Sequence, residues 1–169
     1  MEENNSASES SHVSPEEAAI KLIDGLQTAV IQVLTTMAME DVKYTGREEV
    51  ANLTLRQEVG GLIRLYGGAS EGMVGLASSR TVVAEIVSRI VGLPPDSLDQ
   101  EDLLDGIAEL ANMVCGSMKS KAQVGYQVSL SPPVAIIGRD YTARWKTLNP
   151  TWVLKFLIDG SEFEVYASF

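Results

Sequence analysis

Between Gln100 and Ala122 the apolar residues recur at the spacing of a helix, and this is the clearest pattern in the chain. At about 100° per residue they fall on one side, which is typical of a helix that packs against a core. These residues are Leu103, Leu104, Ile107, Leu110, Ala111, Val114 and Met118. The opposite side carries residues that lie within about 80° of each other. We call them the polar ridge: Asp105, Glu109, Asn112, Gly116 and Lys119.

Two residues of the polar ridge are poor helix formers. Asn112 and Gly116 are each less favourable in a helix than alanine, by up to about 1 kcal/mol. Two such residues on an exposed helix face are better explained by a function than by stability. Most polar helix faces are simply solvated, however, and on the pattern alone a solvated face without any function is the favoured interpretation.

Hydrophobic periodicity and turn residues predict the other elements. Helices are expected over residues 15–39 and from a cap at Ser78 or Ser79 to residue 90, with strands over 59–66, 73–77, 127–131, 134–137, 151–158 and 162–167. Ser14-Pro15-Glu16-Glu17 forms a capping box with proline at the first helical position. Asp159-Gly160 is a two-residue hairpin turn. Residues 41–56 alternate weakly, so short extended pieces are expected there.

Composition limits the class of protein. The chain has 169 residues, of which 45% are hydrophobic, enough for a single domain over residues 14–169. Residues 1–13 are polar and acidic, which predicts a disordered tail rather than a signal peptide. A net charge of −10 disfavours nucleic acid as a partner. No apolar run approaches the ~20 residues of a membrane span, so a cytoplasmic protein is expected.

Most residue types used for catalysis or metal binding are scarce. Cys115 is the single cysteine, which excludes an internal disulfide, and it lies near the apolar side of its helix. His12 is the single histidine and falls in the predicted tail, so no histidine-based triad or metal site is expected.

The polar ridge also resembles a known motif. Glu109-x-x-Asn112, followed by Gly116 and Lys119, resembles the signature helix of the CheX/CheC/FliY family of chemotaxis phosphatases. The segment 129–133, Ser-Leu-Ser-Pro-Pro, and then Gly-Arg-Asp at 138–140 are similar to the strand, double proline and turn that follow this helix in CheX. The resemblance extends from about residue 15 to the C-terminus.

A short internal repeat bears on the number of sites. Residues 22–26, Leu-Ile-Asp-Gly-Leu, match residues 103–107, Leu-Leu-Asp-Gly-Ile, 81 positions later. The family is built from two such halves related by a pseudo-two-fold axis. Thr28 stands at the place of Glu109 and Ile31 at the place of Asn112, so the chain resembles CheX, which carries the signature once. The resemblance implies an α+β fold with helices on one face of a mostly antiparallel sheet.

The resemblance also implies a reaction. CheX-like proteins remove the phosphoryl group from the aspartate of a response regulator such as CheY. By resemblance Asn112 positions the hydrolytic water, because an amide has both a donor and an acceptor, and Glu109 pairs with a lysine of the regulator. Gly116 lets the partner approach closely. Asp105 and Lys119 extend the contact or are simply solvated.

Further expectations concern cofactors and assembly. This chain is expected to bind no metal, with Mg²⁺ held by the partner regulator, and to form a homodimer by pairing of sheet edges. The loop at residues 138–150 contacts either the regulator or the second subunit. A non-catalytic module that binds a receiver domain, and a structural protein of the flagellar switch, are the alternative functions.

Overall fold

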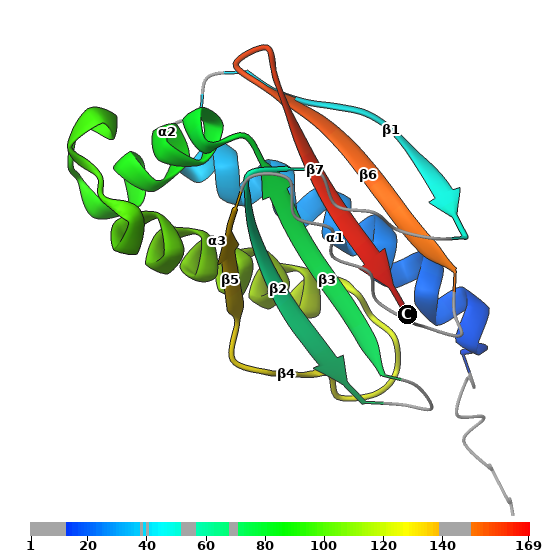
Figure 1. Ribbon diagram of the computed structural model, residues 1–169. Coiled ribbons are helices and arrows are strands. Elements are labelled where there is room, and N and C mark those ends of the chain that lie inside the picture. The colour runs from blue at the N-terminus through cyan, green and yellow to red at the C-terminus, as the bar shows by residue number, and fades with distance from the viewer. Residues whose placement is uncertain (1–12, 38, 40, 52–56, 68–70, 139–149) are drawn as a thin grey trace, which may run out of the picture.

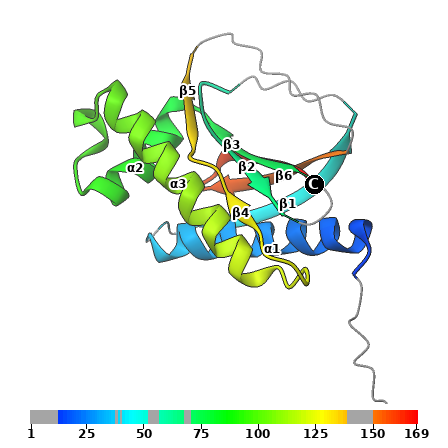
Figure 2. The same ribbon diagram turned by 90° about the horizontal axis from the view of Figure 1, so that it is seen from below.

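The computed structural model describes residues 13–37, 39, 41–51, 57–67, 71–138 and 150–169. These residues form an α+β domain in which helices pack against one twisted sheet, as predicted (Figure 1). Viewed from below, the two long helices cross each other beneath the same face of the sheet (Figure 2). Residues 1–12 of the tail predicted over 1–13, and residues 139–149 of the loop predicted over 138–150, lie outside the described residues, so both remain predictions.

The helices begin and end at the residues that cap them. They are α1 (Pro15–Thr36), α2 (Arg80–Val91), the short 3-10 helix η1 (Pro95–Ser97) and α3 (Gln100–Lys121). Ser14 and Glu17 form the predicted capping box, and the hydrogen bonds from Ser14 hold the pKa of the Glu17 carboxyl below its ordinary value. Ser79 caps α2, which ends at Gly92 in the left-handed conformation. Asp99 caps α3.

The sheet has seven strands among the described residues. They are β1 (Val42–Val50), β2 (Val59–Tyr66), β3 (Gly72–Ser78), β4 (Ser129–Leu130), β5 (Val134–Ile137), β6 (Thr151–Ile158) and β7 (Ser161–Ser168). The order is β1-β6-β7-β3-β2-β4, with β5 also paired to β2, and every pairing is antiparallel. Asp159 and Gly160 both have positive φ, which confirms the predicted hairpin turn.

The sheet consists of two halves, and the edge strand of each half pairs with the hairpin of the other half. In the first half β2 and β3 form a hairpin and in the second β6 and β7 do, while β1 pairs with β6 and β5 with β2. A shift of 91 residues maps one hairpin onto the other, since Val74 pairs with Ala167 and Leu76 with Val165. The pseudo-two-fold axis therefore passes between β3 and β7.

The two long helices repeat with the shift of 81 residues seen in the sequence. From Leu22 to Thr35, each residue has the burial class of the residue 81 positions later, apart from the pairs Ile23/Leu104 and Gln32/Met113. The short repeat therefore marks two equivalent helices, α1 and α3. The core lies between these helices and the sheet, and its largest fully buried side chains include Phe156, Phe163, Ile23, Leu26, Ile107 and Leu110.

Glycines permit the closest contacts of α3. A Cβ on Gly106 would lie 2.4 Å from the Cγ atoms of Val87 in α2, and one on Gly61 in β2 would lie 2.9 Å from the Ile107 carbonyl oxygen. Both distances are shorter than van der Waals contact. Helix α3 is thus held tightly between α2 and β2, which fixes the direction of its exposed side.

Three elements differ in extent from the prediction. Helix α1 ends at Thr36 rather than near residue 39, because Met37 leaves the helical conformation while the Met39 N–H still bonds to the Leu34 carbonyl. Strand β1 is one long strand with a register shift between Tyr44 and Gly46, where short pieces were expected. Strand β4 has only two residues, because the ladder stops before Pro132, which has no N–H to donate.

Helix α1 is, by length and composition alone, long and apolar enough to cross a membrane. Half of the relevant 18-residue stretch is buried within the fold. Its buried side chains, among them Leu22, Leu26, Val30 and Leu34, belong to the common core. The apolar character of α1 is therefore explained by its packing against α3 and the sheet.

Candidate functional site on helix α3

The polar ridge lies on the solvent side of α3, as the periodicity predicted. Asp105, Glu109, Gly116 and Lys119 are exposed, and Asn112 is half-buried. The opposite side of the helix is buried, with Leu104 half-buried and Gly106 and Cys115 added to the predicted apolar residues. The structure therefore brings all the ridge residues together on one face.

The polar side chains of the ridge have no partner within the described part of the chain. None of the ion pairs or side-chain hydrogen bonds there involves Asp105, Glu109, Asn112 or Lys119. Glu101, also exposed, precedes Asp105 by four residues, as Asp105 precedes Glu109. Like charges at this spacing destabilise a helix by about 0.2–0.5 kcal/mol per pair. The helix N-terminus favours the carboxylate of Glu101 in the first turn. The repulsion at Asp105 and Glu109, beyond that turn, is compensated by no described cationic side chain.

Gly116 is not required by the protein's own packing. A Cβ built on it would meet no heavy atom within 4 Å, apart from the neighbouring backbone of its own helix. Gly116 is also not one of the described glycines that have a positive φ, so the backbone conformation does not require a glycine here. A glycine in mid-helix costs about 1 kcal/mol relative to alanine. The gap at Gly116 is therefore available to something outside this fold.

The equivalent face of α1 is different. Asp24, the counterpart of Asp105, accepts a hydrogen bond from Arg47 on β1, with 2.6 Å between Oδ1 and Nη1. The Arg47 guanidinium lies over the Trp152 ring, 5.5 Å from its centroid. Thr28 donates its hydroxyl to the Asp24 carbonyl oxygen of its own helix. Asp24 and Thr28 are thus bonded inside the chain, a difference that the sequence pattern did not reveal.

The chemistry available at the ridge is that of an amide and a carboxylate. Burial raises the pKa of the Cys115 thiol to about 12, so it stays protonated and is not a nucleophile at neutral pH. Within the described ranges, no three or more His, Cys, Asp or Glu residues are placed to hold a metal ion. What the ridge offers a substrate is hydrogen bonding and charge.

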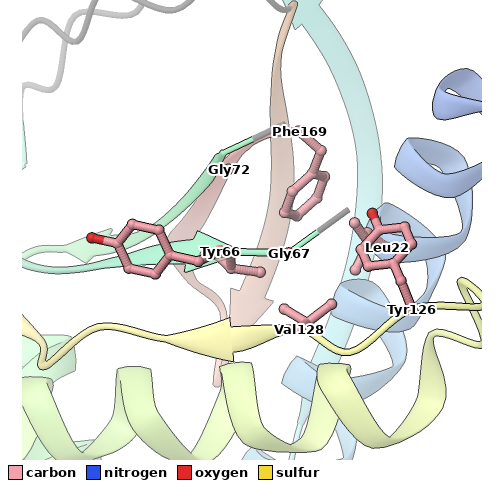
Figure 3. A pocket seen from close by; sticks show the side chains of 8 residues that line it. Leu22, Tyr66, Gly67, Gly72, Tyr126, Val128 and Phe169 are labelled. Carbon is pink, nitrogen blue, oxygen red and sulfur yellow. The ribbon is translucent and has the colours of Figure 1, made fainter. Parts of the chain in front are cut away.

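A small pocket lies away from the ridge (Figure 3). It is lined by Leu22, Leu65, Tyr66, Gly67, Gly72, Tyr126, Val128 and Phe169. Its volume is about 20 Å³, room for no more than one water molecule. Burial raises the pKa of Tyr126, so this phenol stays protonated. The pocket is too small for an organic substrate, and the ridge remains the candidate site.

The sequence over residues 59–157, more than half of the chain, matches the family model described as chemotaxis phosphatase CheX. The chain belongs to the CheX family. The matched segment contains α3 and the whole polar ridge, together with the prolines of the β4–β5 connection. Among curated proteins, none matches the chain's sequence significantly.

Solved structures of this family share the fold. A CheC-like superfamily protein from Shewanella sp. PV-4 has a TM-score of 0.78 at 24% identity, covering 88% of this chain and 97% of its own. The CheX of a Borrelia burgdorferi CheX–CheY complex with BeF₃ and Mg²⁺ has a TM-score of 0.71 at 19% identity, covering 87% and 96%. Thermotoga maritima FliY has a TM-score of 0.61 at 19% identity, covering 92% and 91%. At these identities the likeness concerns the fold.

The family and the fold class predicted from the sequence are thus confirmed. The roles of Glu109, Asn112, Asp105, Gly116 and Lys119 stay predictions. The structure places these residues on one face of α3. Arg139 and Asp140 of the predicted turn lie outside the described residues.

Proposed function

We propose that this chain dephosphorylates the aspartyl phosphate of a CheY-type response regulator in the cytoplasm. The observation that carries the proposal is the polar ridge: on the helix that matches the CheX family, Glu109 is exposed and Asn112, one turn later, is half-buried, and neither has a partner among the residues that the structure describes. The CheX protein in a solved CheX–CheY complex from Borrelia burgdorferi has the same fold as this chain, which supports a CheY-type regulator as the partner.

In this proposal Asn112 positions the water. Hydrolysis of an acyl phosphate needs water in line with the departing carboxylate, and the transition state is stabilised mainly by positioning and charge. The oxygen of the Asn112 amide accepts a hydrogen bond from the water, and its NH₂ group is available as a hydrogen-bond donor. Because the amide is neutral, it does not repel the negatively charged phosphoryl group. The regulator supplies the phosphoaspartate and the Mg²⁺, so this chain needs no metal site of its own.

Glu109 and Gly116 set the position of the partner. The Glu109 carboxylate, one turn before Asn112, pairs with a lysine beside the phosphoaspartate and fixes the register of docking. Truncating one member of such a desolvated pair typically costs 2–5 kcal/mol of binding. The open space around Gly116 admits the partner's backbone next to the helix. A homodimer leaves this chemistry unchanged and is part of the same proposal.

The test is the decay of a phosphorylated CheY-type receiver domain from the same organism, in Mg²⁺, with and without this protein. Wild type should accelerate decay. Asn112→Ala should lose at least 100-fold of that acceleration, as removal of a transition-state hydrogen bond does in other enzymes. Glu109→Ala should weaken binding.

Two control substitutions outside the ridge distinguish the loss of a site residue from a general effect of replacing a polar residue in a helix. Gln32→Ala removes an exposed amide from mid-helix in α1, and Glu85→Ala removes an exposed carboxylate from mid-helix in α2. Both should retain wild-type activity. If wild type accelerates the decay of no receiver, catalysis is wrong, and the ridge is a docking surface of a non-catalytic or flagellar-switch protein.

A further inference from the structure

The two equivalent helices carry an aspartate at the same position, but the two aspartates have different surroundings. Asp24 and Asp105 are separated by the shift of 81 residues that relates α1 to α3, and both are exposed. Asp24 holds the guanidinium of Arg47. Asp105 holds no cation within the described chain, although Glu101 and Glu109 on either side add to its negative potential. Among the described residues, one copy of this carboxylate position is thus paired with a cation and the other is not.

The register of the sheet explains why Asp105 has no cationic partner among the described residues. The shift of 91 residues maps Leu65 onto Phe156 and Gly61 onto Trp152, so Leu130 corresponds to Tyr44 and Ala135 to Glu49. Pro133 therefore stands where Arg47 stands in the first half. A proline carries neither a charge nor a side-chain donor, so the second half has nothing at that place to neutralise Asp105.

We propose that Asp105 takes from the regulator, in trans, the cation that Asp24 takes from Arg47 in cis. The occupant is a lysine or arginine side chain of the receiver domain, about one helical turn from the group that contacts Glu109. This inference rests on the proposed function and adds to it a second charged contact. The two contacts fix the direction in which the receiver lies along α3.

Asp105 acts in this arrangement by positioning. It precedes Asn112 by seven residues, which corresponds to about 10 Å along a helix. At that distance its carboxylate does not reach the phosphoryl group that Asn112 serves. The occupied copy indicates the geometry, since the Asp24 side chain is 60% exposed and the Arg47 side chain 32% exposed while they form their pair. Docking of a receiver would bury the Asp105 pair further and strengthen it.

The first experiment measures binding to a receiver held in its phosphorylated-like state by beryllium fluoride and Mg²⁺. Asp105→Asn should raise the dissociation constant about tenfold at low salt, and less at high salt because exposed charges are screened. The turnover rate at saturating phosphorylated receiver should stay at the wild-type value. Asn112→Ala should show the opposite pattern, with binding kept and turnover lost. Asp24→Asn is the matched control and should bind like wild type.

A second variant supplies the missing cation from within. Pro133→Arg places a guanidinium at the position equivalent to Arg47, where it competes for Asp105. It should weaken receiver binding in the wild-type background and leave binding unchanged in the Asp105→Asn background. Replacing in turn each exposed lysine and arginine around the receiver's phosphoaspartate should identify one whose loss weakens binding to wild type and not to Asp105→Asn.

The outcomes separate this inference from the proposed function. If Asp105→Asn binds the receiver as tightly as wild type while Asn112→Ala loses turnover, the trans cation is wrong and the phosphatase stands. If Asp105→Asn weakens binding but wild type does not accelerate decay, the docking contact stands and catalysis falls. Absence of receiver binding by wild type overturns both.

Discussion

Helices α1 and α3 are equivalent elements whose buried sides agree and whose exposed faces differ. Both pack against the same face of the sheet, and their burial agrees almost position by position (Figure 2). On α1, Asp24 is paired with Arg47 and Thr28 bonds to its own backbone. On α3, the equivalent face carries charges that no described residue pairs and a glycine with open space around it. The two helices share most of their buried positions and the exposed aspartate, whereas Glu109, Asn112 and Gly116 stand only on α3, where α1 has Thr28, Ile31 and Thr35.

The largest expected effect on stability comes from a substitution that disrupts the packing that the two helices share. Gly106→Ala places a Cβ 2.4 Å from Val87, so α2 or α3 must shift, and we expect a loss of about 1–3 kcal/mol in the free energy of unfolding. Gly25→Ala, at the equivalent position, meets the Ala122 Cβ at 3.2 Å, and the better helix propensity of alanine offsets the smaller strain. Urea denaturation measures both. Equal losses in the two variants would contradict tighter packing of α3.

An intermediate effect separates stability from activity at Gly116. Gly116→Ala adds a methyl group in open space, so the free energy of unfolding should rise by about 0.5–1 kcal/mol. The same methyl group stands where a partner approaches, so receiver dephosphorylation should fall several-fold. Thr35→Ala, at the equivalent position of α1, should also raise stability and leave activity unchanged. A more stable Gly116→Ala protein with full activity would remove this residue from the site.

The smallest effect compares the two aspartates in the absence of any partner. Asp24→Asn weakens the ion pair with Arg47, so the free energy of unfolding should fall by up to about 1 kcal/mol. Asp105→Asn relieves repulsion by Glu101 and Glu109 and should raise it by about 0.2–0.5 kcal/mol per neighbour. Thermal unfolding at low ionic strength measures the two changes. Opposite signs are required, and a loss of stability in Asp105→Asn would mean that its charge is already compensated.

Much of the fold follows from local chemistry. The caps at Ser14 and Ser79, the left-handed Gly92 and the Asp159-Gly160 turn place most element boundaries, because each satisfies backbone groups within a few residues. Periodicity alone separates the buried side of α3 from the polar ridge. Such features are readable because their physical cause lies in neighbouring residues.

Features that depend on distant residues were not readable. Strand β1 has polar residues along most of its length, and only its pairing with β6, more than 100 residues later, makes it a strand. The pairing of Arg47 with Asp24, and the placement of Pro133 at the equivalent position, emerge only from the sheet register. The site was predictable as a face of one helix, whereas its contrast with α1 needed the tertiary structure.

The exchange of edge strands has a consequence for how the chain is made. Strand β1 is synthesised early but pairs with β6. Its hydrogen bonds, for example those between Val42 and Ile158, therefore form only after β6 has been synthesised. Such separated pairings slow folding, because the chain entropy is lost before the contacts form. Each half lacks its border strand until the other half has been synthesised. Helix α1, which carries no signature of its own, remains necessary because it packs against α3 and so supports the helix that bears the ridge.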